Sequence, residues 1–519
     1  MADRVNDVPG LVGGLMDSAV WSGYLRVTKP SSVSNLFYVF IEGPKGAPLI
    51  IFGQGGPGCS SMLGLFTEFG PWRPQRGGSL VPNPYSWSKV ASLLFIDSPV
   101  GAGFSYESGV KTKLNDETSA LDFVSAVDLF FHRYPEMESV VFHFASESYG
   151  GHFLMQWTDL VLNTEQFGNL AGRLQGIILG NPYVSWESSD LAYAHAVWGR
   201  QLVSKPLWDE FEQRGCSVFG GYSSFSYPAE CQSLLLRVLS QKDSSTELES
   251  NLNPYNLIDP SCVSSQSQRV LQLGVAARSR GPDRSGGESL QSPSVSSVDV
   301  NSHYSDPCVE LYLLAYLSRS DVKRALHVDD SGPESWIQCS DDVFYNWPTA
   351  DSQADMTRLF RELMRSSVGT LRILVFSGDA DGVCPTIGTQ QWIWESSRDR
   401  KVVSLWSPWY DESGQTGGFV TRFEHQATFA TAHSAGHMVA ASQPLRALSL
   451  VKGYLSGSDE LFANATLIQV AGSRIQSAAL YPQSSASESF SIAVVVVFLT
   501  AASLALFIAM AQRLGKGRG

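Results

Sequence analysis

Short runs of apolar residues recur along the chain, and turn-forming residues follow each of them. Such runs predict buried β-strands, and they cover residues 48–52, 92–96, 139–144, 175–179 and 371–376. Residues 117–132 instead place apolar side chains at helical spacing, which predicts an amphipathic helix between two of the strands. Buried strands that alternate with helices are typical of a mostly parallel sheet, so the pattern indicates an α/β fold.

The pattern changes between residues 184 and 306, where two helical stretches, 189–203 and 229–239, replace the alternation. We interpret this region as a lid-like insertion over the sheet. Inside it, residues 276–301 are rich in Ser, Gly, Arg and Pro, which predicts a disordered loop open to proteolytic cleavage. The two parts of the core that flank the predicted insertion are residues 1–183 and 307–458.

The last part of the chain has the composition of a membrane anchor. Residues 492–511 carry no charge, and at about 1.5 Å per residue a helix of that length crosses a hydrocarbon core of about 30 Å. A basic tail follows, which predicts a cytosolic C-terminus and a single-pass type I topology. The predicted segments are a polar stalk at 459–489, a transmembrane helix at 490–511 and a cytoplasmic tail at 512–519.

This topology predicts that the rest of the chain is extracellular or lies in the lumen of the secretory pathway, the Golgi or a lysosome or vacuole, where disulfides form. Residues 1–21 contain no apolar core long enough for a signal peptide. We interpret this as the loss of a preceding signal, in preference to insertion through the C-terminal segment alone. Asn464 lies in an N-x-S/T sequence and is the predicted glycosylation site.

Composition narrows the classes of function. The net charge of −13 argues against nucleic acid or an anionic membrane surface as the main partner, because both attract basic patches. The seven cysteines form no C-x-x-C pair and the nine histidines no H-E-x-x-H motif, so we expect no metal site. The glycine-rich residues 53–61 follow neither the phosphate-loop nor the dinucleotide-binding order, so we expect no cofactor.

A candidate nucleophile lies in the sequence A-S-E-S-Y-G-G-H-F at residues 145–153. Ser148 stands on a predicted strand-to-helix turn, the place where a G-x-S-x-G sequence presents a catalytic serine. Ser146 occupies the position of the first glycine, and the acid Glu147 lies directly beside the candidate nucleophile. The N–H of Tyr149, at the start of a predicted helix, would face an oxyanion.

A base and an orienting acid follow further along the chain. Asp379 and Asp381 come after the strand at 371–376, where open α/β sheets build their sites. His437 lies in a glycine-flanked loop, and the order Ser, Asp, His is that of α/β-hydrolases. Each signal also has a structural interpretation, since an Asp after a strand often caps a helix and a loop His is often only exposed. Residues 53–61 suit the second half of an oxyanion hole.

Further stretches of the chain complete a family pattern. They are W-S-G-Y-L at 21–25, G-G-P-G-C-S-S at 55–61, F-T-E-F-G-P at 66–71, N-P-Y-S-W at 83–87, D-S-P-V-G-A-G-F-S-Y at 97–106, E-S-Y-G-G-H at 147–152, S-G-D-A-D at 377–381 and A-G-H-M-V at 435–439. The chain resembles the serine carboxypeptidase family, and among its members the membrane-anchored processing carboxypeptidases. The resemblance implies an α/β-hydrolase fold with a helical, disulfide-bearing insertion and a C-terminal transmembrane helix.

The resemblance also implies roles for individual residues. Ser148 corresponds to the nucleophile, His437 to the general base and Asp381 to the acid that orients the imidazole, whereas Asp379 would be structural. The N–H groups of Gly56 and Tyr149 correspond to the oxyanion hole. The implied disulfides are Cys59–Cys339, Cys216–Cys231 and Cys262–Cys308, which leaves Cys384 as the free thiol.

In the family, the acid before the nucleophile and a second acid share a proton and bind the substrate's C-terminal carboxylate. Here they correspond to Glu147 and Glu68. Two close carboxyls raise each other's pKa, and the neutral partner donates to a third carboxylate, so we expect an acidic pH optimum. The neighbouring amide is Gln54, one methylene longer than the usual Asn, which changes its reach.

The resemblance therefore implies a serine-type carboxypeptidase that releases C-terminal amino acids from peptides or proteins through an acyl-enzyme. Two alternatives are an acyltransferase that uses the same triad and a non-catalytic binding or stabilising member of the fold. The intact acid pair favours peptide hydrolysis over acyl transfer, and the complete triad disfavours a purely non-catalytic role. The sequence leaves the oligomeric state and the side-chain preference at the scissile bond open.

Overall fold

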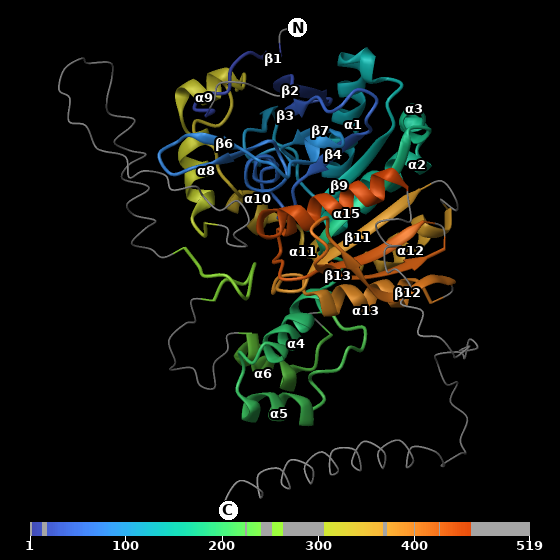
Figure 1. Ribbon diagram of the computed structural model, residues 1–519. Coiled ribbons are helices and arrows are strands. Elements are labelled where there is room, and N and C mark those ends of the chain that lie inside the picture. Colours follow the sequence, from blue (N-terminus) through green and yellow to red (C-terminus); the bar gives the residue numbers. More distant parts are fainter. Residues whose placement is uncertain are drawn as a thin grey trace, which may run out of the picture. The chain divides into compact units, whose positions relative to one another are not determined.

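The computed structural model describes residues 3–12, 18–223, 226–239, 252–262, 306–366, 371–398, 400–424 and 426–457 (Figure 1). Residues 1–466 form one compact unit, and residues 467–519 form a second unit that lies wholly outside the described residues. The predicted stalk, transmembrane helix, cytoplasmic tail, glycosylation site Asn464 and loop 276–301 also lie outside them. Of the helices in the described ranges, none combines the length and the apolar character that a membrane span requires.

A large mixed sheet forms the centre of the first unit, with twelve strands in the described residues. Its order is β1-β2-β3-β7-β4-β9-β10-β11-β14-β13-β12, and β8 pairs with β3. The strands from β7 to β14 run parallel, and antiparallel strands extend the sheet on both sides. The strands are β1 Arg4–Val5, β2 Val20–Thr28, β3 Ser32–Ile41, β4 Leu49–Gly53, β7 Ser92–Ile96, β8 Tyr106–Gly109, β9 Phe142–Ser148, β10 Leu174–Pro182, β11 Arg372–Gly378, β12 Val402–Tyr410, β13 Thr416–Phe423 and β14 Ala427–Ala432, with β5 Trp72–Pro74 and β6 Leu80–Pro82 in a separate two-stranded sheet.

Helices cover both faces of the sheet, which gives the layered arrangement in Figure 1. One face carries α1 Asp116–Arg133, α2 Gly150–Asn163, α12 Thr357–Ser366 and α13 Thr386–Ser396, and the other carries α8 Val309–Leu317, α14 Val439–Ser442 and α15 Pro444–Ser456. The remaining helices and single turns are η1 Gly64–Glu68, η2 Trp87–Lys89, η3 Pro135–Met137, η4 Glu165–Phe167, α3 Gly168–Ala171, η5 Glu187–Leu191, α4 Ala192–Gly199, α5 Lys205–Gln213, α6 Ala229–Leu239, α9 Ser320–Ala325, α10 Asp341–Asn346 and α11 Thr349–Ser352.

The central strands are buried on both faces, which explains why their sequences are almost continuously apolar. In β4, Leu49 and Ile51 belong to the hydrophobic cluster under α1 and α2, whereas Ile50 and Phe52 belong to the cluster under α8 and α15. Successive side chains of a strand point to opposite faces, so a strand covered on both sides needs apolar residues at every position. The two clusters therefore fix the register of the parallel strands and the position of their carboxyl ends.

The predicted mostly parallel sheet is confirmed, with two corrections. The strand predicted at 139–144 is β9, Phe142–Ser148, because a turn that follows η3 occupies residues 138–141. The strand thus continues to the candidate nucleophile itself. The strands β2, β3, β12, β13 and β14 were not predicted. Polar or glycine residues interrupt the apolar runs in β2, β12, β13 and β14, whereas β3, which is continuously apolar at residues 36–41, was overlooked.

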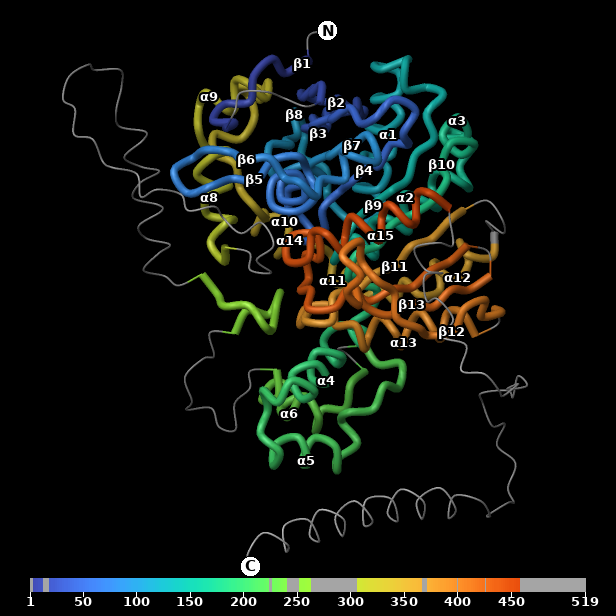
Figure 2. The backbone as a smooth tube through the Cα atoms, in the orientation of Figure 1, coloured from blue at the N-terminus to red at the C-terminus, as the bar shows by residue number. Residues whose placement is uncertain are grey.

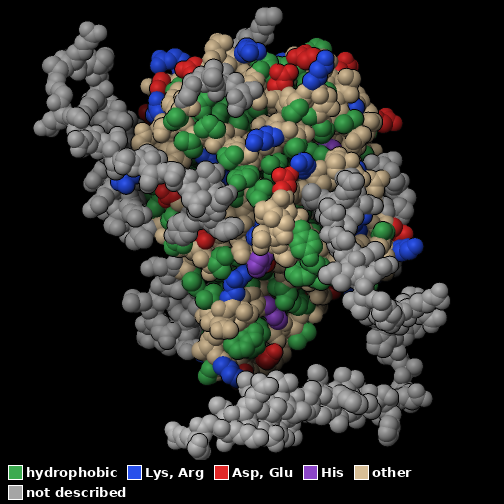
Figure 3. Space-filling view, viewed as in Figure 1, with side chains coloured by type: hydrophobic (Ala, Val, Ile, Leu, Met, Phe, Trp, Pro, Cys, Tyr) green, Lys and Arg blue, Asp and Glu red, His purple; other side chains and the backbone are tan. Residues whose placement is uncertain are grey.

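Helices α4, α5 and α6 lie together beyond α13, as Figures 1 and 2 show. They enclose a third hydrophobic cluster, which is separate from the two clusters at the sheet. The predicted pairing Cys216–Cys231 lies inside this cluster and is confirmed. The pairings Cys59–Cys339 and Cys262–Cys308 are confirmed too, and Cys384 is the free cysteine among the described residues. On the face shown in Figure 3, basic and acidic side chains are interspersed.

Candidate active site

Ser148 is the last residue of β9 and adopts a left-handed backbone conformation, with φ of 59°. Non-glycine residues seldom occupy this region, and such strain is typical of the turn that presents a nucleophile before a helix. Tyr149 follows as the N-cap of α2, which starts at Gly150. The sequence therefore folds here into the predicted strand-to-helix turn.

Ser146 is accommodated without backbone strain, because it stays in extended strand backbone. Its Oγ donates to the carbonyl oxygen of Gly53 at 2.6 Å, which joins β9 to the end of β4. A Cβ atom at Gly150 would lie 1.8 Å from the Ser146 Oγ, so the second glycine of the motif makes room for this serine. The Ser146 side chain, in place of the first glycine, therefore links the nucleophile turn to the end of β4 by a hydrogen bond.

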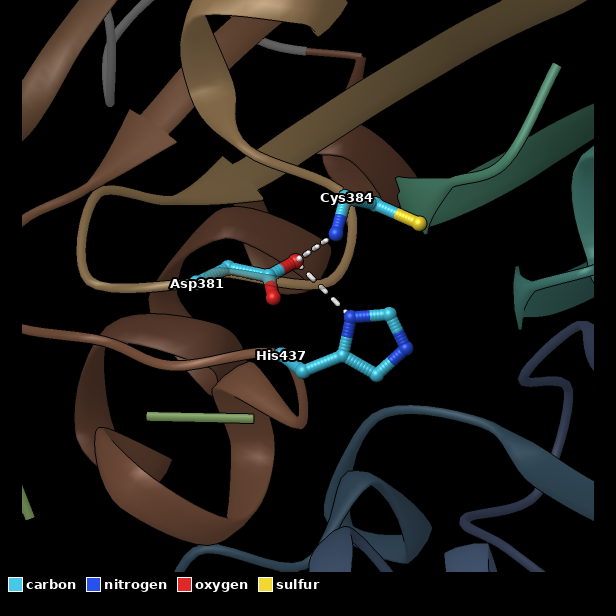
Figure 4. A group of neighbouring side chains, drawn as sticks. All are labelled: Asp381, Cys384 and His437. Atoms are coloured by element: carbon cyan, nitrogen blue, oxygen red, sulfur yellow. Dashed lines mark hydrogen bonds and ion pairs between the residues drawn. The ribbon is translucent and has the colours of Figure 1, made fainter. Parts of the chain in front are cut away.

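Asp381 and His437 meet at the carboxyl end of the sheet, beyond β11 and β14, as Figure 4 shows. The Nδ1 of His437 lies 2.8 Å from Oδ2 of Asp381 and donates to it. The same oxygen accepts from Nδ2 of Asn181 at 2.6 Å and from the Cys384 N–H at 3.1 Å, and Oδ1 accepts from the Val383 N–H at 2.7 Å. Four donors thus hold this carboxylate and fix the ring of His437.

His437 is buried, and its Nε2 has no hydrogen-bond partner among the described residues. Burial lowers the pKa of His437, but the charge of Asp381, their hydrogen bond and the charge of Glu147 outweigh it, so the net direction is upward. The backbone N–H of His437 donates to the carbonyl oxygen of Tyr255 at 2.6 Å, and the Tyr255 ring packs edge-on against the imidazole. The free Nε2 is the atom that a general base uses.

The donor atoms of Asp381, Cys384 and His437 lie within 4.8 Å of one another. Figure 4 shows that the sulfur of Cys384 points away from the Asp381–His437 pair, and the residue meets Asp381 through its backbone N–H. Burial raises the pKa of the Cys384 thiol well above its usual range, and a metal site needs the thiolate. The geometry favours a hydrogen-bonded Asp–His pair over a metal centre.

The glycine-rich loop after β4 lies directly against the nucleophile turn. A Cβ atom at Gly55 would lie 2.8 Å from the Tyr149 nitrogen and 2.9 Å from the Ser148 Cβ, so only glycine permits this approach. Gly56 has φ of +121°, which also requires glycine. The hydrogen bonds of the described residues leave the N–H groups of Gly56 and Tyr149 without an acceptor, so both can donate to a developing oxyanion.

Asp97, which sequence reasoning placed in a motif without a role, holds this loop. Its Oδ1 accepts from Ser60 Oγ at 2.7 Å and from the Ser61 N–H at 2.8 Å, and its Oδ2 accepts from the Phe104 N–H at 2.9 Å. Burial raises the pKa of Asp97 to about 6, although these donors oppose the shift. The carboxyl end of β7 thus positions the glycine-rich loop that carries Gly56.

Glu147 and Glu68 form a buried pair beside Ser148. Gln54 Nε2 donates to Glu147 Oε1 at 2.6 Å, whereas Gln54 Oε1 and Glu68 Oε1 have no partner among the described residues. Burial raises the pKa of Glu68 well above its usual range, and the charge of Glu147 and a hydrogen bond between the two carboxyls add to it. Burial also raises the pKa of Glu147.

The packing explains this desolvation. The pair borders a cavity of about 10 Å³ whose other walls are mostly apolar, formed by Phe52, Phe69, Trp87, Ala145, Ile178, Phe376, Val439 and Ala440. An apolar wall offers no hydrogen bonds to a carboxylate, so the neutral form is favoured there. Burial and mutual repulsion therefore both raise the pKa of the pair and favour a protonated carboxyl in it.

The structure brings the predicted triad, oxyanion-hole and acid-pair residues together at the carboxyl ends of the strands, whereas Asn464 lies outside the described residues and Cys216–Cys231 lies in the helical cluster. It also adds two residues that sequence reasoning missed. Asn181, with φ of 38°, donates to Asp381 and accepts from the Gly378 N–H. Asp116 accepts from the Tyr149 hydroxyl at 3.0 Å and from Trp347 Nε1 at 3.0 Å. Asp116 is the first residue of α1 and precedes the helix predicted at 117–132. The sequence did not indicate these contacts, because the partners of Asp116 are distant in sequence.

Comparisons with known proteins agree with this geometry. A family model described as serine carboxypeptidase matches residues 9–457. Serine carboxypeptidase-like 33 of Arabidopsis thaliana is 31% identical over 448 residues, with 85% of this chain and 88% of that protein covered. Serine carboxypeptidase-like 26 of Oryza sativa subsp. japonica is 30% identical over 471 residues, with 88% and 90% covered.

A solved structure is similar in fold. Kex1(Δ)p, a prohormone-processing carboxypeptidase from Saccharomyces cerevisiae, aligns with a TM-score of 0.67 and 22% sequence identity, with 88% of this chain and 96% of that chain covered. The expected α/β-hydrolase fold is confirmed by this likeness and by the sheet order.

Proposed function

Because the chain belongs to the serine carboxypeptidase family, we propose that it releases single amino acids from peptide C-termini through an acyl-enzyme on Ser148. The observation that carries the proposal is the buried pair of Glu68 and Glu147, directly beside the strained Ser148. A serine, a base and an oxyanion hole suit many acyl transfers. A proton-holding acid pair beside them suits a substrate that ends in a free carboxylate.

In the proposed reaction, His437 Nε2 takes the proton of the Ser148 hydroxyl while its oxygen attacks the carbonyl carbon of the last peptide bond. The N–H groups of Gly56 and Tyr149 donate to the oxyanion that forms. The C–N bond then breaks, and the proton on His437 passes to the leaving amine, which departs as a free amino acid. Water, deprotonated by His437, attacks the acyl ester, and the proton returns to Ser148.

Substrate recognition rests on the protonated form of the acid pair. With one proton shared between Glu68 and Glu147, a carboxyl O–H and the Gln54 amide are available as donors to the substrate's carboxylate. When the pair loses this proton, two anions face a third, and binding weakens. We propose that this loss sets the alkaline limb of activity, and that protonation of His437 sets the acidic limb.

The test compares N-blocked dipeptides that end in a free carboxylate with the same dipeptides as C-terminal amides. We expect the wild-type chain to release the last amino acid from the free acids, with kcat/KM for the amides at least about tenfold lower, because a charge-assisted hydrogen bond is lost. The Ser148→Ala chain is expected to be inactive on both. Equal rates for the wild-type and Ser148→Ala chains would favour the non-catalytic alternative.

The same assay separates hydrolysis from acyl transfer. With an activated ester donor and an alcohol acceptor present, a carboxypeptidase releases mainly the free acid, because water reaches the acyl-enzyme. Product in which the acyl group has moved to the alcohol, in excess over free acid, would favour the acyltransferase alternative instead.

We also propose that the catalytic unit faces a lumen or the cell exterior and is anchored through residues 490–511. Three disulfides support an oxidising compartment, and the charge-free residues 492–511 followed by a basic tail support a membrane span. Alkaline carbonate is expected to release a chain that ends at residue 489 from membranes and to leave the full chain bound. Release of both chains would contradict the anchor.

A further inference from the structure

Asp190 is a partly exposed acid in a turn that packs against the loop of the catalytic acid, and it has no countercharge in the described residues. It lies in η5, the single turn between β10 and α4. Within the described residues its carboxyl contacts one hydrogen-bond donor, its own backbone N–H, and it takes part in no ion pair. The neighbouring acid Glu187 differs, because it accepts from the N–H groups of Gly220 and Gly221 at 2.5 and 3.0 Å.

The turn η5 packs directly against the loop that carries the catalytic acid. Ser189 Oγ donates to Cys384 Sγ at 3.8 Å, and the Cys384 N–H donates to Asp381. The charge of Asp190 acts on the Cys384 thiol and on the Tyr183 hydroxyl, whose pKa values it raises in addition to the effect of burial. Tyr183 in turn donates its N–H to the Ser148 carbonyl oxygen at 2.7 Å. Asp190 is therefore within electrostatic reach of residues that touch the triad.

The pair of Glu68 and Glu147 lies over one face of the sheet, and Tyr183, which the charge of Asp190 affects, lies over the other face. Glu68 and Glu147 border side chains of the cluster under α8 and α15, such as Phe52 and Phe376. Tyr183 instead packs on the cluster under α1 and α2. A substrate whose C-terminal residue lies over the first cluster, as the proposed function requires, extends its acyl portion across Ser148 toward the second cluster.

We propose that Asp190 is a specificity-determining residue that favours a basic side chain, Arg or Lys, in the substrate residue whose carbonyl Ser148 attacks. The proposal rests on the proposed function, since that function orients the substrate. A partly buried carboxylate with no cation in reach gains most from a ligand that brings one. The flexible stem of Arg or Lys packs along the Tyr183 ring while its charged end reaches the carboxylate.

The test uses three N-blocked dipeptides with the same C-terminal residue and with arginine, its neutral isostere citrulline, or glutamate before it. Burial raises the pKa of Asp190 to about 6, so rates are compared at pH 7, where the carboxylate is charged. We expect kcat/KM of the wild-type chain to be at least about tenfold higher for arginine than for citrulline, as for other hydrogen bonds to charged groups. The glutamate peptide is expected to be the poorest substrate.

In Asp190→Asn, we expect the arginine-to-citrulline ratio to fall to about one, while the citrulline rate stays within a few-fold of wild type. Asp190→Glu keeps the charge and should keep a preference for arginine. Glu187→Gln is the matched control, because the Glu187 carboxylate is occupied by backbone N–H groups, and it should leave the ratio unchanged.

The outcomes distinguish this inference from the proposed function. An active wild-type enzyme with equal rates for arginine and citrulline, or a preference that survives in Asp190→Asn, overturns the role of Asp190 and leaves the carboxypeptidase proposal intact. A wild-type chain that is as inactive as Ser148→Ala on all three peptides rejects both. The wild-type ratio alone decides the matter if Asp190→Asn does not fold.

Discussion

Two buried carboxyl sites flank Ser148, and they differ in how many donors reach them. The Asp381 carboxylate accepts four hydrogen bonds, from His437, Asn181 and two backbone N–H groups. In the pair of Glu68 and Glu147, the Gln54 amide is the side-chain donor from outside the pair that reaches Glu147, and Glu68 Oε1 has no partner among the described residues.

The carboxyls of both sites are buried, so burial alone does not decide whether a site favours the ionised or the neutral carboxyl. Hydrogen bonds to an ionised carboxyl stabilise the charge, and their scarcity leaves desolvation and mutual repulsion to favour the neutral form. One site is therefore built as a fixed acceptor that orients a base. In the other the neutral form is favoured, which suits the proposed hydrogen bond to the carboxylate of a substrate.

The largest expected effect comes from Asp381→Asn, which changes the carboxylate that accepts four hydrogen bonds. An amide cannot accept from His437 Nδ1 in the same way, so the imidazole adopts the wrong tautomer, and we expect kcat to fall by about 10⁴-fold with little change in KM. Asp379→Asn is the matched control, since Asp379 contacts the more exposed His433 and should lower kcat by less than about tenfold. Steady-state kinetics on a blocked dipeptide measures both, and a similar loss in the two variants would contradict the assignment of Asp381.

The next test is Glu68→Gln, which removes one acid of the pair. The shared proton is lost, so we expect KM for free-acid dipeptides to rise by about 10- to 100-fold while kcat changes little. Dipeptide amides serve as the control, because they do not use the carboxylate site and should respond less. A fall in kcat for both substrate types would show that Glu68 supports catalysis and not recognition.

The pH profile of the wild-type chain separates the two sites without mutation. The raised pKa values of Glu68 and Glu147 predict that KM is low below them and increases on the alkaline side, by up to about tenfold per pH unit once the shared proton is lost. The raised pKa of His437 predicts that kcat falls on the acidic side, where the base is protonated. A KM that stays flat from mildly acidic to mildly alkaline pH would contradict the proton-holding pair.

The smallest test is Gln54→Asn, which shortens the amide beside the pair. The Gln54 hydrogen bond lowers the pKa of Glu147, so its loss should move the alkaline rise in KM to higher pH. We expect KM at acidic pH to change by only about threefold, because one neutral donor is exchanged for another. An alkaline limb that stays in place or shifts to lower pH would contradict this effect of Gln54 on Glu147.

Much of this arrangement was predictable because local rules decide it. Apolar runs identified the central parallel strands, and the Ser, Asp, His order indicated Ser148, an acid at 379 or 381, and His437, whereas the family resemblance singled out Asp381. The edge strand β12 was missed, because a strand with exposed positions keeps polar residues that break the apolar pattern. Asn181 and Asp116 were missed because a hydrogen bond between residues far apart in sequence leaves no periodic signal.

By itself, the sequence determined the α/β fold, the family and the identity of the residues that carry the proposed chemistry, since each of these depends on residue type and order. Tertiary structure decided which carboxyl is saturated with donors and which is left to hold a proton, because that depends on atoms brought together by the packing of separate strands. It also brought the turn that carries Asp190, an acid without a countercharge among the described residues, against the loop that carries Asp381, through a contact between Ser189 and Cys384. Such distances follow from the fold as a whole, and no local pattern encodes them.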